Sequence, residues 1–483
     1  MHDRTQASRR RAGDVAALLA IFAIAFFVVG WSGNLTSGPH YVDEAQIFTL
    51  KHQFERDGFW STSFDHLHER LTSTKRLVPV FIVQKLVLIE VLGGNLFAWH
   101  TYTLLLGVLS AWILYAAARW VGLTAIESFG FAAVAAVGPQ SVVWWRLIHG
   151  EGIGMLFTAL AMLCIPAALD SKVRGRYQIL FVTFVVLASL SKESFILLMP
   201  ALVGGKIAVE RYMRSGGWLP ALRENGGVAA LLGAVCTTEL ATIRFYYQKT
   251  DFAYTGWKGF DADRLMAATQ EFFAPTRGWM VLAAVGIAVG SYAWSRRKGP
   301  LGPVGATWAI AGAIVVPQVL LYMSSGFSGQ TADLARYLLP GTLALSLLAI
   351  APAVWARVSS GSAGIQLVTG GVLIVYVGLQ GWTAFTEARR HEAPAMESKK
   401  LVERAEVYAE AGERVVVVGG QLHGATKPYR TAAILRGYLG IENVRCLPVT
   451  DDARQAGFLF AHFAPREYGR EKRADYVAKS GRG

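Results

Sequence analysis

Two neighbouring carboxylates that follow the first apolar run have the chemistry of a general base. Asp43 and Glu44 come about ten residues after that run, which ends near Gly33. A carboxylate within hydrogen-bond reach of a hydroxyl can take its proton while the oxygen attacks another centre. Either carboxylate is therefore a candidate base. Adjacent carboxylates in a loop are also often no more than solvated charge, so the pair by itself leaves both interpretations open.

Several cationic residues have the chemistry to hold a phosphate. Arg336, followed by Tyr337, stands directly before a late apolar run, and its guanidinium can form a bidentate pair with a phosphate. Arginine and tyrosine at such a place are also ordinary interfacial anchors. Lys192 and Glu193 interrupt an apolar stretch, where a charge is costly unless it has a function or a partner, although they could simply pair with each other. The remaining candidates for substrate binding are Arg76, Lys85 and Glu151.

Metal and nucleotide sites have weaker support in the sequence. His66 and His68 have a spacing that could touch a metal, but scattered histidines in one loop are more often surface residues, and we expect no metal site. The segment 415–424 resembles a strand that enters a glycine-rich turn, yet it lacks the GxGxxG pattern. The chain has only 3 cysteines, so no disulfide framework or cysteine-based metal site is expected.

The composition places these residues in a membrane protein. Of 483 residues, 53% are hydrophobic and 17% are charged, and the mean hydropathy is +0.36. An average soluble protein is about 25% charged. The composition excludes a disordered chain, a nucleic-acid-binding domain and an ordinary cytosolic enzyme. The net charge of +13 does not indicate a nucleic-acid partner, because membrane proteins collect lysine and arginine at the cytoplasmic ends of their helices.

The chain contains eleven apolar runs that we interpret as transmembrane helices, because a spanning helix needs roughly 20 mainly apolar residues. They lie at 14–33, 97–119, 125–144, 151–169, 177–190, 195–209, 228–246, 279–294, 304–323, 338–355 and 365–385. The first run follows three arginines and is interpreted as a retained signal anchor with a cytoplasmic N-terminus.

The loops between these runs predict an orientation. When the runs are threaded alternately through a membrane, the even-numbered loops from the fourth onward are basic, as the positive-inside rule requires of cytoplasmic loops. This agreement depends on the interruption at 191–193, which must separate two helices for the later loops to keep their sides. Three long segments, at 34–96, 248–278 and 324–335, then lie outside. The first contains an amphipathic stretch at 77–92 that fits a helix in the membrane interface.

The composition becomes that of a soluble domain after the last apolar run. A helix is predicted near 396–411, strands near 415–418, 443–449 and 457–463, and another helix near 429–439. We therefore expect two domains, a transmembrane catalytic domain at 1–386 and a small extracytoplasmic α/β domain at 387–483. The predicted fold is mainly α, polytopic, with about eleven spans.

The positions of these features resemble the GT-C superfamily of integral-membrane glycosyltransferases, in particular its protein O-mannosyltransferase, aminoarabinose transferase and arabinofuranosyltransferase-like branches. The resemblance covers about residues 1–386. Its elements are the acidic pair after the first span, the juxtamembrane helix, Glu151 at the start of the fourth span, the Ser-Lys-Glu-Ser break at 191–194, and the run Arg336-Tyr-Leu-Leu-Pro340. Two motifs differ from that family: Thr74-Lys-Arg-Leu-Val-Pro79 replaces the frequent His-Pro-Pro, and Gly150-Glu151 replaces the usual Thr-Asp.

The resemblance implies that the protein transfers a sugar, with inversion, from a polyprenyl-phosphate donor to an acceptor hydroxyl on the extracytoplasmic face. The acceptor is expected to be a glycan, a lipid or a protein. Asp43 would deprotonate it, and Glu44 and Glu151 would hold the acceptor or orient the cations. Arg336 and Lys192 would stabilise the charge that grows on the leaving phosphate. No cofactor is required, since arginine and lysine can stabilise a monophosphate, although a divalent cation is compatible with this chemistry.

The resemblance also implies a place in the cell. The expected location is the plasma (inner) membrane, where the protein would contact membrane lipid but no nucleic acid. Two other functions fit the same setting. An O-antigen-type polymerase or ligase should carry its large loop late in the chain, whereas here the largest is the first. A lipid or glycan transporter should show internal repeats and ionisable residues at mid-membrane depth, of which Glu239 is an exceptional case.

Overall fold

The computed structural model describes a mainly helical chain. The described residues are 2–38, 44–72, 76–214, 217–247, 262–295, 301–325, 335–360, 363–410, 416–419 and 445–448. The chain divides into two compact units that are each discontinuous in sequence. Unit 1 contains Met1–Ser32, His68–Ile82 and Thr101–Arg389, and unit 2 contains Gly33–Leu67, Val83–His100 and Arg390–Gly483.

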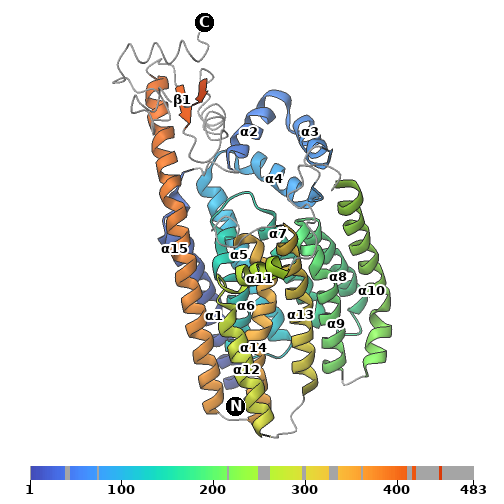
Figure 1. Ribbon diagram of the computed structural model, residues 1–483. Coiled ribbons are helices and arrows are strands. Elements are labelled where there is room, and N and C mark those ends of the chain that lie inside the picture. Colours follow the sequence, from blue (N-terminus) through green and yellow to red (C-terminus); the bar gives the residue numbers. More distant parts are fainter. Residues whose placement is uncertain are drawn as a thin grey trace. The chain divides into compact units, whose positions relative to one another are not determined.

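Unit 1 is a helical bundle (Figure 1). Its helices are α1 (His2–Phe26), most of α5 (Leu96–Trp120), α6 (Ala125–Ala136), α7 (Gly150–Ala167), α8 (Arg174–Ser189), α9 (Met199–Met213), α10 (Trp218–Ala241), α11 (Ala262–Phe273), α12 (Gly278–Ser295), α13 (Leu301–Ser325) and α14 (Leu339–Ser360). Shorter turns of 3-10 or π helix are η1 (Phe27–Trp31), η3 (Pro139–Trp144), η4 (Glu193–Leu198), η5 (Thr242–Tyr247) and η6 (Ala335–Leu338). α7 packs along α8, and α14 packs against α6 and α13.

Five of the described helical segments are long and apolar enough to cross a membrane. They are Ala12–Trp31, Leu96–Trp120, Gly150–Ala167, Trp218–Phe245 and Ala335–Val354. These segments are what a helical membrane protein requires, because a helix satisfies its own backbone hydrogen bonds inside the bilayer. All eleven apolar runs of the sequence lie on helical segments, but several of these are shorter than a span. The count of eleven spans and the orientation stay predictions.

The apolar stretch around Ser191 is two helices, as expected. α8 ends at Ser189, and α9 begins only at Met199. Lys192 has an extended backbone, with φ −162° and ψ 137°, and therefore cannot continue the helix. The break places Lys192 and Glu193 at the end of the bundle.

The third apolar run, at 125–144, is not one helix, which differs from the expectation. α6 ends at Ala136, because Gly138 has a φ of +145° and Pro139 follows it. Side chains satisfy the carbonyls that this break exposes. Gln140 Nε2 donates to the carbonyls of residues 134, 135 and 137 at 3.2, 3.2 and 3.0 Å, and Ser141 Oγ donates to that of Ala136 at 3.0 Å.

Unit 2 contains helices from the first long loop of the chain. They are α2 (Ala45–Asp57), most of α3 (Phe59–Thr72) and most of α4 (Pro79–Leu92), with the short turn η2 (Asn34–Thr36) before them. α4 is the helix that the pattern at 77–92 predicts, whereas the sequence pattern assigned no element to α2 and α3. Gly58, with a φ of +85°, separates these two.

The last described helix, α15 (Ala363–Glu410), is a single helix of 48 residues. It contains both the last apolar run and the amphipathic segment predicted after it, so the expected division at 386/387 falls inside one helix. Strands β1 (Val416–Gly419) and β2 (Arg445–Pro448) lie where two strands were predicted, and they pair in parallel. The helix predicted at 429–439 and the strand at 457–463 lie outside the described residues. An extracytoplasmic α/β domain therefore stays a prediction.

Candidate functional site

Three charged segments of unit 1 meet at one end of its bundle. The start of α7 carries Glu151, the turn after α8 carries Lys192, and η6 carries Arg336. Lys192 Nζ lies 3.1 Å from Glu151 Oε1, and Arg336 Nε lies 3.8 Å from the same oxygen. The side chain of Glu151 is 1% exposed, against 9% for Lys192 and 14% for Arg336. A buried carboxylate therefore holds two cations that are more accessible than itself.

The ring of Tyr337 contacts both cations. Lys192 Nζ lies 4.8 Å and Arg336 Cζ 5.0 Å from its centroid, which is the range of cation–π attraction. Arg336 Nη2 also donates to Tyr337 Oη at 3.4 Å. Because both cations lie within 3.8 Å of one carboxylate oxygen, a single phosphate-sized anion beside them can contact both.

Arg76 and Glu193 form the second ion pair of this region. The contact is bidentate: Arg76 Nε donates to Glu193 Oε1 at 3.0 Å, and Arg76 Nη2 donates to Oε2 at 2.9 Å. Burial favours a raised pKa for Glu193, but the charge of Arg76 and its hydrogen bonds, with a smaller effect of Lys192, lower that pKa to about 2. The charge of Glu193 in turn raises the pKa of Arg76 against the effect of burial, with weaker help from Tyr337 and Glu151. The pair is therefore fully ionised at neutral pH.

A glycine at the start of α7 allows these segments to approach. A Cβ at Gly150 would lie 2.3 Å from the carbonyl oxygen of Ser191, which is closer than real side chains come. One turn later, a Cβ at Gly154 would lie 2.9 Å from the ring of Phe195. Small residues four apart let helices and turns pack backbone to backbone. This close packing is what places Lys192 against Glu151.

Two more residues of this region are not singled out by the sequence motifs. Arg336 Nη1 lies 3.2 Å from Nε2 of His149, the N-cap residue of α7. A guanidinium only donates, so His149 Nε2 accepts and the proton of the neutral ring sits on Nδ1. Arg146, in the turn before α7, is 2% exposed. The sequence indicates both residues only by their position directly before Glu151.

We call these residues the Glu151 cluster: Arg76, His149, Glu151, Lys192, Glu193, Arg336 and Tyr337. Six of them are candidates from the sequence, and residues far apart in the chain come together here. The cluster contains three cations, Arg76, Lys192 and Arg336, and two carboxylates, Glu151 and Glu193. An arrangement of this kind can accept one anion and stabilise negative charge that develops on it.

The other candidate residues belong to unit 2 or are not described. Asp43 lies outside the described residues. Glu44, directly before α2, is 1% exposed. Lys85 is 3% exposed, and its Nζ lies 2.7 Å from His66 Nε2 and donates to Gln46 Oε1 at 3.2 Å. The assignment of Asp43, Glu44 and Lys85 to the site therefore stays a prediction.

Within the part of the chain that the structure describes, no three histidine, cysteine, aspartate or glutamate side chains group as a metal site would need. His66, one of the two histidines considered for a metal, lies in contact with Lys85. Glu239 of α10 is 6% exposed and accepts a hydrogen bond from Ser189 Oγ at 2.9 Å.

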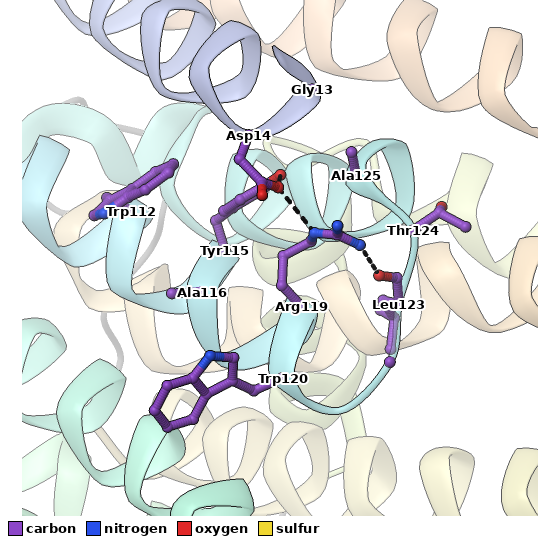
Figure 2. Close-up of a pocket in the computed structure, with 11 residues that line it drawn as sticks. Gly13, Asp14, Trp112, Tyr115, Ala116, Arg119, Trp120, Leu123, Thr124 and Ala125 are labelled. Atoms are coloured by element: carbon purple, nitrogen blue, oxygen red, sulfur yellow. Dashed lines mark hydrogen bonds and ion pairs between the residues drawn. The ribbon is translucent and has the colours of Figure 1, made fainter. Parts of the chain in front are cut away.

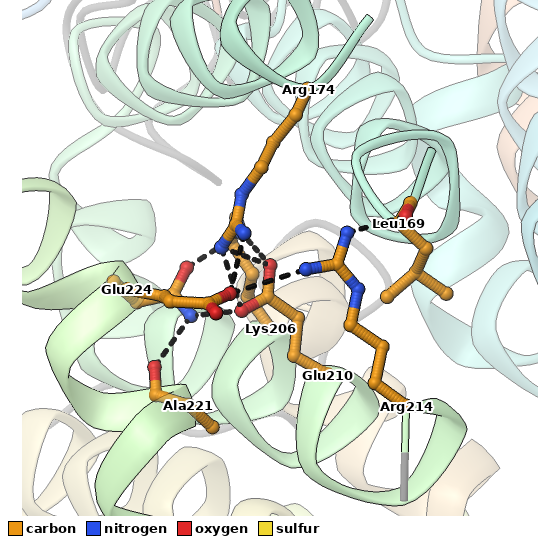
Figure 3. A network of polar contacts seen from close by, with 8 residues as sticks. Leu169, Arg174, Lys206, Glu210, Arg214, Ala221 and Glu224 are labelled. Carbon is orange, nitrogen blue, oxygen red and sulfur yellow. Dashed lines mark hydrogen bonds and ion pairs between the residues drawn. The ribbon is translucent and has the colours of Figure 1, made fainter. Parts of the chain in front are cut away.

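A second buried charge network lies at the opposite ends of α8 and α9 (Figure 3). We call it the Glu210 network, and its members are Arg174, Lys206, Glu210, Arg214, Glu224 and Asn225. Lys206 Nζ donates to Glu210 Oε1 at 2.9 Å and to Asn225 Oδ1 at 2.6 Å, and all three residues are at most 2% exposed. Arg174 Nη2 lies 3.2 Å from both oxygens of Glu210. This network ties α8, α9 and α10 together.

Comparisons with known proteins do not assign the chain to a family. No protein-family model matches the sequence, and no curated protein matches it significantly.

Proposed function

We propose that this protein is a membrane glycosyltransferase that moves a sugar from a polyprenyl-phosphate donor to an acceptor hydroxyl. The observation that carries the proposal is the Glu151 cluster, in which Arg336 and Lys192 share one buried carboxylate oxygen and one aromatic ring. When the bond between a sugar and a lipid phosphate breaks, negative charge grows on the phosphate. Cations held in place in a site of low dielectric constant stabilise that charge without having to reorganise.

Six of the seven members of the cluster have a role in this proposal. Arg336 and Lys192 bind the phosphate oxygens, and Glu151 holds the two cations together before the donor arrives. Tyr337 limits where both cations can move. Arg76 and Glu193 fix the turn that carries Lys192, because Glu193 is its neighbour in sequence and is held bidentately.

The transfer itself forms one bond and breaks one. The acceptor oxygen attacks the anomeric carbon, the bond from that carbon to the phosphate oxygen breaks, and the configuration inverts. The electron pair of the broken bond stays on the lipid phosphate, and the proton of the acceptor goes to a carboxylate, for which we propose Asp43. Glu44 would position the acceptor. We place this reaction on the extracytoplasmic face of the plasma (inner) membrane, in a protein of about eleven spans.

The first experiment tests the phosphate-binding role of Arg336. Membranes that contain the protein are given a polyprenyl-phosphate donor with a labelled sugar, and both donor binding and label transfer are measured. Arg336→Ala should lower transfer about 10²- to 10³-fold, because a fixed transition-state donor is lost. Arg336→Lys should restore only part of it, since an ammonium lacks the planar fork of a guanidinium. Unchanged donor binding and transfer in Arg336→Ala would contradict the proposed role.

Arg357→Ala is the matched control for this experiment. Arg357 lies in the last turn of α14, the helix that follows the η6 turn of Arg336, and it pairs with Glu127 at 2.9 Å. Its loss removes an arginine and an ion pair but no member of the Glu151 cluster. Transfer per folded molecule should therefore stay near that of the unsubstituted protein.

The second experiment separates chemistry from binding. Asp43→Asn keeps the shape of the side chain and removes the base, so transfer should fall by about 10²- to 10⁴-fold while donor binding is retained. Glu44→Gln should have a smaller effect, because it positions a reactant without taking the proton. Donor binding with a normal transfer rate in Asp43→Asn would contradict the mechanism. Donor binding with no transfer by the unsubstituted protein would favour a transporter.

A further inference from the structure

An open pocket lies at the other end of the unit 1 bundle from the Glu151 cluster (Figure 2). It has a volume of about 730 Å³ and is lined by residues of α1, α5, α6 and the turn between α5 and α6. The start of α5 is tied to η3, because Thr103 Oγ1 donates to the carbonyl of Trp144 at 3.0 Å. The pocket surrounds the last turns of α5, so the length of this helix separates it from the region that precedes Glu151.

The pocket is placed where two apolar spans end. Asp14 is in the first turn of the span Ala12–Trp31, and Arg119 is in the last turn of the span Leu96–Trp120. Lipid headgroups lie at this depth in a bilayer, and tryptophan and tyrosine are enriched there. Trp112 and Trp120 both line the pocket, and Trp112 stacks on Tyr115 with ring centroids 5.0 Å apart.

The charged groups of the pocket have spare hydrogen-bonding capacity. Tyr115 Oη donates to Asp14 Oδ1 at 2.5 Å, and Arg119 Nε donates to the same oxygen at 3.0 Å. Arg119 Nη1 donates to the carbonyl of Leu123 at 2.5 Å. Within the described residues, Asp14 Oδ2 and Arg119 Nη2 therefore keep one acceptor and one donor group for a ligand. The side chains of Asp14 and Arg119 are 38% and 23% exposed, so a ligand can reach them.

Apolar side chains around the pocket are exposed on the same helices. Val15 and Leu19 of α1 are 56% and 62% exposed, and Ile126 of α6 is 58% exposed. Such side chains at the end of a span contact acyl chains. A ligand with a polar head in the pocket and hydrocarbon below it fits both surfaces.

We propose that this pocket binds a phospholipid with a phosphoethanolamine headgroup. The phosphate would pair with Arg119 Nη2, and the primary ammonium would donate to Asp14 Oδ2. An anionic headgroup that has no amine could pair its phosphate with Arg119 but would offer no ammonium to Asp14 Oδ2. A choline headgroup has no N–H to donate to Asp14. This inference does not depend on the proposed transferase activity.

The test is lipid retention by the full-length protein, measured by native mass spectrometry. Delipidated protein in detergent is titrated with phosphatidylethanolamine, phosphatidylglycerol or phosphatidylcholine that carry the same acyl chains. Phosphatidylethanolamine should bind about tenfold more tightly than either of the others, as expected for one further hydrogen bond to a charged group. Equal retention of the three lipids would overturn the proposal.

Variants of the pocket residues test whether a preference among the three lipids arises from this pocket. Asp14→Asn should remove the preference for phosphatidylethanolamine, and Arg119→Gln should weaken binding of all three lipids. Ala116→Phe should fill the pocket, which Ala116 lines, without touching the Asp14–Arg119 pair, so it serves where the charge variants fail to fold. Arg357→Gln, which alters an ion pair outside the pocket, is the matched control and should keep the preference.

Two results would contradict the proposal at this stage. One is a preference for phosphatidylethanolamine that persists in both Asp14→Asn and Ala116→Phe. The other is binding of soluble phosphoethanolamine as tight as that of the lipid, because it would assign the pocket to a free headgroup compound instead of a membrane lipid.

Discussion

The Glu151 cluster and the Glu210 network are both buried groups of cations and carboxylates, but they hold their charges differently. In the Glu210 network, the central lysine and glutamate are 0% and 1% exposed, and Glu210 contacts Arg174, Lys206 and Asn225 at once. In the Glu151 cluster, the cations are the more exposed partners and one contact is as long as 3.8 Å. The central Lys206–Glu210 pair is closed within the protein, although Arg174 and Arg214 at the edge of that network are 20% and 29% exposed. Both cations beside Glu151 are at least 9% exposed, so the Glu151 cluster has no cation as fully buried as Lys206.

The difference follows from the backbone that carries each group. Glu210 and its partners lie on the regular helices α8, α9 and α10, whose packing they stabilise. Lys192 and Arg336 lie in an extended turn and a 3-10 turn at helix starts, where the chain can present a side chain without continuing a helix. Ligand sites are commonly built from such segments on a rigid scaffold. We therefore expect the Glu210 network to stabilise the fold, whereas the Glu151 cluster is the part to which the proposed function gives a role in substrate binding.

The largest effect on stability is expected at Glu210. Glu210→Ala leaves Lys206 buried without its carboxylate, and removing one partner of a buried ion pair costs about 3–5 kcal/mol in the free energy of unfolding. Thermal and denaturant unfolding of the purified protein measure this loss. Glu224→Ala is the matched control, because Glu224 belongs to the same network but is 44% exposed, and its pairs should contribute about 1 kcal/mol or less.

The distinction between the two regions predicts that Glu210→Ala lowers stability without lowering transfer, unlike a substitution in the Glu151 cluster. Transfer per folded molecule should be unchanged in Glu210→Ala and strongly lowered in Arg336→Ala. A folded Glu210→Ala protein that loses transfer as severely as Arg336→Ala would show that the two regions are not functionally distinct.

Replacing Glu193 is expected to have a smaller effect, which is a change in how the stability of the fold depends on acidic pH. Its pKa in the folded protein is about 2, below the ordinary value of 4.5, so its ion pair with Arg76 stabilises the fold fully above about pH 4.5. That stabilisation is lost progressively as the pH falls from 4.5 toward 2. The melting temperature of the protein should therefore exceed that of Glu193→Gln at pH 7, and the gap should close on acidification.

Glu55→Gln provides the comparison for the acid experiment. Glu55 is 59% exposed, and its contact with Lys51 is 3.9 Å long, so its replacement should change the melting temperature little at any pH. A gap for Glu193→Gln that stays constant between pH 7 and pH 2 would contradict the assignment of a lowered pKa to the Arg76–Glu193 pair.

Much of the helical architecture follows from local patterns in the sequence. Apolar runs predict helices because only a helix satisfies the backbone inside a bilayer, and the charges at 192 and 193 predict the break between α8 and α9. The end of α6 was missed, although Gly138-Pro139 is a turn signal, because the surrounding residues are apolar and hydropathy alone continues the span. α2 and α3 were missed because they lie in a polar loop without a long apolar run.

The site was predictable where a charge stands out against an apolar background. Lys192, Glu193, Glu151 and Arg336 have that property, and the structure brings them together. That Glu193 pairs with Arg76, 117 residues away, has no local signal, because it depends on how distant segments pack. His149 belongs to no recognisable sequence motif, and only its contact with the guanidinium of Arg336 marks it as a member of the cluster.

The side chains that cap the end of α6 affect whether water can enter the apolar layer of the membrane. α6 is about 18 Å long, which is less than the roughly 30 Å of a hydrocarbon core, so a start at the interface puts its end inside the apolar layer. Carbonyls exposed at such an end would attract water, and a file of water molecules conducts protons. Gln140 and Ser141 bind these carbonyls from within the protein and remove the need for that water. The chain can thus leave helical geometry ahead of Glu151 without exposing carbonyls that would draw water into the apolar layer.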